Sequence, residues 1–593
     1  MMKRYLLPAT PLAAMLLLTG CIDDNYDLSN INTTSEVKVD GLIIPVNVKD
    51  VTLNSVIDLD ENSDVKKEID PVTGKQIYVY SYSGDFSSDP ISIKPFEVKA
   101  PVLSPQSIEV NLTGSTSSAP AKRAASSAVH YTVSEMVTDF DYVLTDVEES
   151  VTKVADLATP GVTYSTIIKF PASIVNDAEK IEVKDLRIEF PKGLEMAQGY
   201  PSIGSYDSAT GIVTIADYVI GADGTLPLTL VSTRISIDQP VVNGTIDYND
   251  AITVLGGGEL LISPKNGVSP VQSFNLDTQY NMSAFDVTAF SGAIDKPIDG
   301  MAVNPILLND LPSFLSGEGT NLVLANPQLY LALNNPVSQY NLKSHTGLSI
   351  IPVRGNSDAQ AIELPGGLTI NDNKAPGAIY RYVLSPDGAD TTPVAGFEDA
   401  EKLAYPGLGN VLAGNGLPDK LKVEFATPNV YGDNVIDFPL TSDIRGVSGE
   451  YSFRAPLALE EGTIIYYSGT KDDWSSEELD RLHITEMQVT AIATSDIPVG
   501  VLLTGEVIDT AGKHIGICEG ATLPAMAQDH PVTLTIRAAE GTEISNIDGI
   551  YYHATCTVSP DDPAAGEAIS PDQNVVLKSV RAKVTGRYLY EDK

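Results

Sequence analysis

Basic side chains, imidazoles, thiols and indoles are all scarce in this 593-residue chain, which has 38 Lys and Arg against 78 Asp and Glu, six His, three Cys and one Trp. The formal net charge of −40 argues against nucleic acid as a partner, because phosphate binding requires clustered Lys and Arg that release counterions. A composition that is 43% hydrophobic and 20% charged is typical of a globular protein. The length exceeds what one hydrophobic core usually serves, so we expect several domains.

Catalytic signatures are also missing from the sequence. It contains no Gly-x-Ser-x-Gly elbow, no Walker loop and no His-Glu-x-x-His motif. A carboxylate pair for glycoside hydrolysis cannot be recognised among 78 acidic residues without their geometry. We therefore expect a protein that is not an enzyme and that needs no cofactor, with an extracytoplasmic glycosidase as the alternative.

The amino terminus carries the strongest signal. An apolar run over residues 6–18 follows Lys3 and Arg4 and is too short for a membrane span. The run ends in Leu18-Thr19-Gly20-Cys21, which resembles the bacterial lipoprotein box, where signal peptidase cuts before a Cys whose sulfur carries diacylglycerol. The resemblance implies a signal peptide over residues 1–20 and lipid attachment at Cys21, with acyl chains such as palmitate.

An acidic cluster, Ile22-Asp23-Asp24-Asn25-Tyr26-Asp27-Leu28-Ser29, follows directly after Cys21. It resembles the export signal of Bacteroidota surface lipoproteins, which implies display on the outside of the outer membrane. The alternative is a solvated tether over residues 21–36 on a protein that faces the periplasm. In both cases the lipid anchor provides the membrane contact, so no basic patch is required.

The rest of the chain consists of short runs rich in Val, Ile, Thr and Tyr, separated by Gly, Pro, Asn and Asp. This pattern is typical of half-buried strands, and residues 77–82 are an example. Helical patterns are few: residues 475–482 have a capping box, and a second short helix is expected to start at Asn304-Pro305. We predict an all-β fold of tandem, immunoglobulin-like β-sandwich domains with few short helices.

Two segments, residues 326–336 and 486–498, each run an alternating strand into a polar turn that contains proline. They resemble the LEA14-type β-sandwich, in which a strand ending in an Asn/Pro turn recurs, and the resemblance implies a duplicated LEA14-like sandwich in the C-terminal half. Residues 575–588 alternate charged side chains such as Arg581 and Lys583 with apolar ones, which predicts a long closing strand.

Changes in composition suggest where the domains begin and end. We divide the chain into a signal peptide (1–20), an acidic tether (21–36), an N-terminal β domain (37–112), a Ser- and Ala-rich linker (113–128) and three β-sandwich domains (129–300, 301–460 and 461–593).

Cys518 and Cys556 are the thiols that remain once Cys21 is lipidated. In an extracytoplasmic domain they are expected to form a disulfide, worth about 4 kcal/mol, and two buried free thiols are the alternative. His514 and His553 lie near them, but the odd spacing from His553 to Cys556 places these two on opposite faces of a strand. We therefore do not expect a zinc site.

Oxygen ligands recur at alternate positions as at the start of an EF-hand calcium loop, at Asp58, Asp60, Asn62 and Asp64. Ser63 replaces the turn glycine, and Ile69 stands where the bidentate Glu should be. An exposed acidic turn is favoured over a metal site.

Tyr78, Tyr80 and Tyr82 lie on one face of a predicted strand. They form either a stacking platform for a sugar ligand or an aromatic ladder inside a sandwich, and the ladder is favoured.

Together these features predict a lipid-anchored protein of the outer membrane, exposed at the cell surface, that acts as a non-catalytic binding or structural module. Its expected partners are the membrane, through the anchor, and a glycan or protein ligand, but no nucleic acid. A periplasm-facing factor for envelope assembly is a further alternative.

Overall fold

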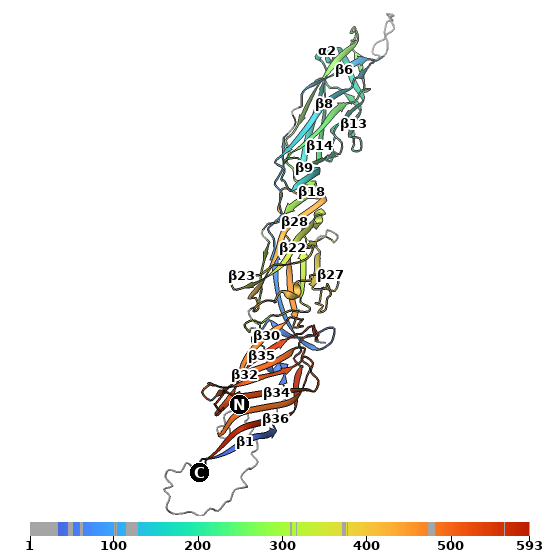
Figure 1. Ribbon diagram of the computed structural model, residues 1–593. Helices are drawn as coiled ribbons and strands as arrows, with labels where there is room; N and C mark the ends of the chain where they lie inside the picture. The colour runs from blue at the N-terminus through green and yellow to red at the C-terminus, as the bar shows by residue number, and fades with distance from the viewer. Residues whose placement is uncertain are drawn as a thin grey trace, which may run out of the picture.

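The computed structural model describes residues 34–45, 51–57, 59, 63–99, 101, 103–113, 128–299, 301–308, 311–315, 317–370, 375, 377–472, 481–561 and 564–591. Strands make up 60% of the chain and helices 3%, which confirms the predicted all-β class of sandwich domains. The molecule is elongated, and its strands are grouped into three sections that follow one another along the long axis (Figure 1). We call them the base, middle and distal sections.

The base section is a nine-stranded antiparallel sheet with the order β1-β36-β31-β34-β33-β32-β35-β30, in which β2 also pairs with β36. Its strands are β1 (Thr34–Pro45), β2 (Val51–Thr52), β30 (Ile464–Lys471), β31 (Leu482–Ser495), β32 (Gly500–Asp509), β33 (His514–Leu523), β34 (His530–Ala538), β35 (Ile547–Thr557) and β36 (Asn574–Glu591). The first and last strands of the described chain are therefore neighbours, paired in register from Thr34 opposite Glu591 to Pro45 opposite Arg581.

The middle section contains a seven-stranded sheet with the order β19-β4-β29-β21-β26-β27, with β3 beside β4. Its strands are β3 (Val65–Ile69), β4 (Gln76–Ser87), β19 (Ala302–Val303), β21 (Gln328–Asn334), β26 (Ile379–Ser385), β27 (Glu401–Ala404) and β29 (Ser448–Pro456). A second layer comes from a twenty-stranded sheet, which contributes β20 (Ile306–Leu307), β22 (Lys343–Arg354), β23 (Ser357–Asp358), β24 (Ile362–Glu363), β25 (Leu368–Ile370) and β28 (Lys420–Pro439).

The distal section holds the other strands of the twenty-stranded sheet. They are β5 (Glu97–Lys99), β6 (Gln106–Leu112), β7 (Val129–Val133), β8 (Met136–Thr145), β9 (Val151–Lys169), β10 (Ala178–Glu189), β11 (Glu195–Met196), β12 (Ser205–Asp207), β13 (Ile212–Val219), β14 (Thr225–Pro240), β15 (Ile246–Val254), β16 (Glu259–Pro264) and β17 (Ser273–Met282). Strand β18 (Ala289–Pro297) pairs with β9 on one side and with β28 on the other, so it joins the distal and middle sections.

Helical elements are short in the described part of the chain. They are α1 (Leu53–Val56), α2 (Ala172–Asp177) and the 3-10 turns η2 (Ser313–Leu315), η3 (Ser338–Tyr340) and η4 (Leu408–Asn410). No helix among the described residues has the length and apolar character needed to cross a membrane.

The strands form because apolar side chains alternate with polar ones along them. In β14, Leu226, Leu228 and Leu230 are buried on one face, and the residues between them are more exposed. One large hydrophobic cluster runs through the distal and middle sections and extends to a few residues of the base. The base has a second, separate cluster of seven buried side chains, namely Ile484, Val507, Cys518, Ile536, Ile544, Ile547 and Val584.

Three expectations differ from the fold. Residues 37–112 were expected to form one domain, but they supply strands to all three sheets, because the chain runs from the base to the distal end and then returns. The helix expected at Asn304-Pro305 is wrong, because Ile306 is fully buried and pairs with Leu421 of β28 in an extended conformation. The two LEA14-like segments are not equivalent, because β21 leads into β22 of another sheet whereas β31 leads into β32 of its own sheet.

The remaining expectations concern the closing strand, the boundary near residue 460, and two segments that lie largely outside the described residues. The long closing strand is confirmed as β36. The change in composition near residue 460 coincides with the passage from β29 of the middle section to β30 of the base. The helix predicted over residues 475–482 and the linker over residues 113–128 lie almost entirely outside the described residues.

Candidate binding cleft between the distal and middle sections

A wide polar cleft of about 660 Å³ lies beside the strand that joins the distal and middle sections. We call it the junction cleft. Its lining consists of Ser92, Ile93, Lys94, Pro95, Glu148, Lys296, Leu440, Thr441, Ser442 and Asp443. These residues come from the β4–β5 connection, the β8–β9 turn, the end of β18 and the loop after β28.

The walls of the junction cleft are fixed by backbone hydrogen bonds between segments that are distant in the sequence. Ile91 and Ile444 exchange two of them, at 2.8 and 2.9 Å. The N–H of Leu440 donates to the carbonyl of Thr288 at 2.9 Å, and the N–H of Asp295 donates to the carbonyl of Ser150 at 2.8 Å. A ligand would therefore meet a preformed surface, which lowers the entropy cost of binding.

Glu148 is the most constrained polar side chain of the cleft. Its carboxylate accepts hydrogen bonds from Lys296 Nζ at 2.5 Å, from Ser150 Oγ at 2.8 Å and from the N–H of Lys94 at 3.2 Å. Burial acts to raise the pKa of Glu148, but these hydrogen bonds outweigh it and the net pKa lies below the ordinary value. Glu148 is therefore ionised at neutral pH and cannot serve as a general acid.

The groups left free to meet a ligand are exposed. Ser92, Thr441 and Ser442 present hydroxyls, Lys94 an ammonium group and Asp443 a carboxylate. Such a set suits a ligand with many hydroxyl groups, because each of these side chains can donate or accept a hydrogen bond. No aromatic ring is among the described residues that line the cleft.

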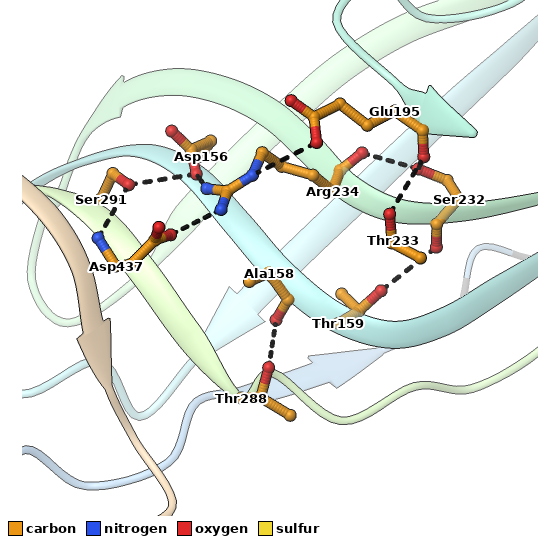
Figure 2. Close-up of polar contacts among 10 residues, drawn as sticks. All are labelled: Asp156, Ala158, Thr159, Glu195, Ser232, Thr233, Arg234, Thr288, Ser291 and Asp437. Atoms are coloured by element: carbon orange, nitrogen blue, oxygen red, sulfur yellow. Dashed lines mark hydrogen bonds and ion pairs between the residues drawn. The ribbon is translucent and has the colours of Figure 1, made fainter. Parts of the chain in front are cut away.

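A cluster centred on Arg234 lies in the same junction and ties strands of the two sections together (Figure 2). The Arg234 guanidinium of β14 contacts Asp156 of β9 and Asp437 of β28, the latter at 2.5 Å, and lies 3.7 Å from Glu195 of β11. Ser291 Oγ of β18 donates to Asp156 at 3.2 Å and accepts the N–H of Asp437 at 3.3 Å. We call these five residues the junction clasp.

The residues of the junction clasp serve to hold strands together. Its single cation is surrounded by three carboxylates, so no free positive charge remains to bind an anion. Arginine suits this role because its planar fork forms several directed hydrogen bonds at once. The clasp thus fixes β28 of the middle section against β9 and β14 of the distal section.

The predicted lipid site and most of the predicted calcium loop fall outside the described residues. These are Cys21, Asp58, Asp60 and Asn62. Asp64 is described, and its carbonyl accepts the N–H of Ser81 at 3.1 Å. No group of three or more His, Cys, Asp or Glu in the described part of the chain is arranged to hold a metal ion.

The tyrosines of β4 are packing residues. Tyr78 and Tyr80 are buried, and the Tyr80 hydroxyl donates to the carbonyl of Leu307 at 2.6 Å. Tyr82 is half-buried, with its ring stacked 6.5 Å from that of Tyr451. The aromatic ladder is therefore confirmed, and the stacking platform is wrong because two of its three rings are inaccessible to a ligand.

The predicted disulfide between Cys518 and Cys556 is also wrong, since both thiols are free. Cys518 lies opposite Gly505 and Cys556 opposite Val501, so β32 separates the two cysteines and four residues along β32 offset them. Burial raises the pKa of each thiol to about 11, so both are protonated at neutral pH.

Sequence reasoning missed both junction features. Arg234 and Asp437 are 203 residues apart, and Glu148 and Lys296 are 148 apart. Each of these four side chains is one charged residue among many in the sequence. No rule of sequence spacing connects two partners that lie so far apart in the chain. The nearest usable signal is the recurrence of Gly, Pro and Asp over residues 291–320, a stretch that begins inside the joining strand β18.

Comparisons with known proteins leave the family open. No protein family matches the chain, and no curated protein matches it. A crystal structure of a protein from Parabacteroides distasonis, inferred to be secreted, is similar over 50% of this chain and 90% of that chain, with 13% identity and a TM-score of 0.33. We draw no conclusion from a similarity of this size.

Proposed function

We propose that the protein is a lipid-anchored module of the outer membrane, displayed at the cell surface, that binds a ligand without catalysing a reaction. Cys21 is its lipid attachment site, the base section is its membrane-proximal end, and the distal section points away from the membrane. The ligand is a glycan or another molecule rich in hydroxyl groups, held in the junction cleft.

One observation supports this arrangement above the others. Strand β1 begins at Thr34, only about a dozen residues after the predicted lipid site, and pairs with the last strand β36 at one end of an elongated molecule. A tether of this length extends at most roughly 45 Å, so an anchor at Cys21 keeps the base near the bilayer. The junction cleft is then held away from the membrane, where a ligand outside the cell can reach it.

The lipid anchor is tested in the protein's own cells with Cys21→Ala. We expect the wild-type chain to incorporate radiolabelled palmitate, to fractionate with the outer membrane and to be cleaved when intact cells are treated with protease. We expect C21A to lose the label and to leave the membrane fraction. A wild-type protein that is labelled but protected from protease in intact cells would instead support the periplasm-facing alternative.

The cleft is tested by glycan-array binding of the mature chain. Lys94→Ala and Asp443→Ala remove two exposed cleft groups without touching the core, and we expect each to weaken binding about tenfold or less, as for one lost hydrogen bond to a charged group. Lys169→Ala, at an exposed distal position, is the matched control. Equal binding by all four proteins would place the ligand elsewhere.

A further inference from the structure

The last strand of this acidic protein is basic. Strand β36 carries Lys578, Arg581, Lys583 and Arg587 against one acid, Glu591, although acids outnumber bases 78 to 38 in the whole chain. Arg581 and Lys583 are exposed, whereas the residues between and beside them, Val580, Ala582 and Val584, are buried. The positive charges therefore share one face of the base sheet.

The basic residues at the two ends of this row are neutralised, and those at its centre are not. Lys578 lies 3.6 Å from Asp529, and Arg587 binds Glu543 at 2.6 Å and Glu36 at 3.3 Å. None of the described residues forms an ion pair with Arg581 or Lys583. Their charges are thus available to a partner outside the chain.

The adjoining edge strand β1 adds charge and apolar surface to the same corner of the base. Lys38 lies opposite Arg587 and Ile43 opposite Lys583 in the register. The stem of Lys583 passes over Gly41, where an added Cβ would meet its Cε at 2.8 Å, so the ammonium group extends along the edge strand. Ile43 is 60% exposed.

Two more apolar side chains of β1 project from the other face of this edge strand, Val37 at 56% and Leu42 at 48% exposed. We call the set of Lys38, Ile43, Arg581 and Lys583 the basic edge. Asp40, opposite Thr585, lies on the same face and forms no ion pair with a described residue, and the three basic side chains of the basic edge outnumber it. Exposed apolar side chains next to unpaired Lys and Arg are the combination that binds the interface of an anionic bilayer.

The net charge of −40 does not prevent such contact. Charges in water are screened over about 8 Å at physiological ionic strength, so the acidic side chains of the middle and distal sections of the elongated molecule have little effect at the base (Figure 1). A membrane at the base therefore responds to the local charge of the basic edge. This location is also the end that the predicted anchor brings closest to the bilayer.

We propose that the basic edge docks on the anionic headgroups of the membrane that carries the lipid anchor, with Arg581, Lys583 and Lys38 contacting phosphates and Ile43 entering the interface. This inference rests on the proposed function and adds to it a second membrane contact. Such a contact would fix the direction in which the elongated molecule projects, because it adds a second point of attachment to the lipid anchor.

The test uses the full mature chain with Cys21→Ser, so that no acyl chain contributes to binding. We expect it to sediment with phosphatidylethanolamine vesicles that contain about 30% phosphatidylglycerol, to stay soluble with neutral phosphatidylcholine vesicles, and to be released when NaCl rises from about 50 to 300 mM. Arg581→Glu with Lys583→Glu is expected to reduce partitioning at least about tenfold.

The matched control is Lys169→Glu with Lys192→Glu, which makes the same change in net charge at two exposed distal positions and should bind like the parent. If the charge reversal at β36 lowers the melting temperature, Arg581→Gln with Lys583→Gln replaces it. Equal partitioning by the β36 variant and the parent, or equal binding to neutral vesicles, would overturn the proposal. So would soluble polyphosphate that binds the parent while anionic vesicles do not.

Failure of this proposal can be told apart from failure of the proposed function. Palmitate labelling depends on Cys21, and protease accessibility in cells depends on export to the surface; neither depends on the charges of Arg581 and Lys583. If both are positive while vesicle binding is absent, the anchor stands and the basic edge does not dock.

Discussion

The base section and the two sections beyond it use the same antiparallel strands, yet they bury their apolar faces differently. In the distal and middle sections long strands pack in layers around one shared hydrophobic cluster. The ring of Phe290, on the joining strand β18, lies with its centroid 5.2 Å from that of Phe96 and 6.0 Å from that of Phe438. In the base a single sheet encloses a separate cluster of only seven buried side chains. Partly buried side chains such as Met487 and Leu534 surround that smaller cluster.

This difference implies two levels of stability in one chain. Free energy from apolar burial grows with the area removed from water, so the base, with its smaller core, should open before the rest. The two ends of the described chain are nevertheless held together in the base, because β1 and β36 are paired along their length and must be pulled apart before either can leave the sheet. The protein therefore combines a more stable pair of outer sections with a more deformable base.

The largest expected effect comes from Phe290→Ala, which removes the ring shared by the distal and middle cores. Phe290 is fully buried, so the cavity and the lost transfer free energy should cost about 3–5 kcal/mol of unfolding free energy. Hydrogen exchange followed section by section should show faster exchange in both sections and unchanged exchange in the base. Faster exchange in the base as well would contradict the division into two levels of stability.

The next effect concerns the junction clasp. Arg234→Ala leaves Asp156 and Asp437 facing each other without their cation, and we expect a loss of about 2 kcal/mol. A double-mutant cycle with Asp437→Asn should show coupling of roughly 0.5–3 kcal/mol, because the two side chains are in contact. Zero coupling would mean that packing around β18 alone joins the sections.

The strands could be predicted from the sequence, because apolar and polar side chains alternate with a period of two within each segment. The favoured ladder of Tyr78 and Tyr80 and the long strand β36 follow from that local pattern. The pairing of Thr34 with Glu591 could not, because nothing local to either strand encodes its partner. The failed helix at Asn304-Pro305 shows the same limit, since its local Pro signal was overridden by the burial of Ile306 against β28.

The candidate sites show the same contrast between local patterns, which can be predicted from the sequence, and contacts between distant segments, which cannot. The cysteines could be found by composition, but the disulfide expected of them failed because an intervening strand, visible only in three dimensions, separates Cys518 from Cys556. The alternation that placed Arg581 and Lys583 on one face was correct. That no described residue forms an ion pair with them depends on the side chains that the flanking strands β1 and β31 bring beside them. Charge at a site, unlike strand periodicity, is decided by the fold.

A smaller, matched pair of substitutions compares the two cores directly. Ile188→Val in β10 and Ile536→Val in β34 remove the same methylene from a buried position in the distal section and in the base, each at a cost of about 1 kcal/mol. I536V should raise the exchange rates of base amides only, and I188V those of the outer sections only. Limited proteolysis should cut the base of I536V first, and equal cleavage of both variants would argue for a single cooperative unit.

The smallest expected effect concerns Glu148 in the junction cleft and the contribution of its ionised carboxylate to stability. The hydrogen bonds from Lys296, Ser150 and Lys94 keep the pKa of Glu148 below its ordinary value of 4.5, so its contribution to stability is complete above about pH 4.5 and is lost as the pH falls through the lowered pKa. Glu148→Gln should cost about 1 kcal/mol or less at pH 7, and this cost should disappear as the pH falls through the lowered pKa of Glu148, because the wild-type carboxyl is then protonated as well. The difference in denaturant midpoint between wild type and E148Q should therefore shrink on acidification. Asp443→Asn, which removes an exposed acid of the same cleft that forms no ion pair with Lys296, is the control. A pH-dependent difference of equal size in both variants would show that Lys296 responds to the general charge of the cleft instead of to Glu148.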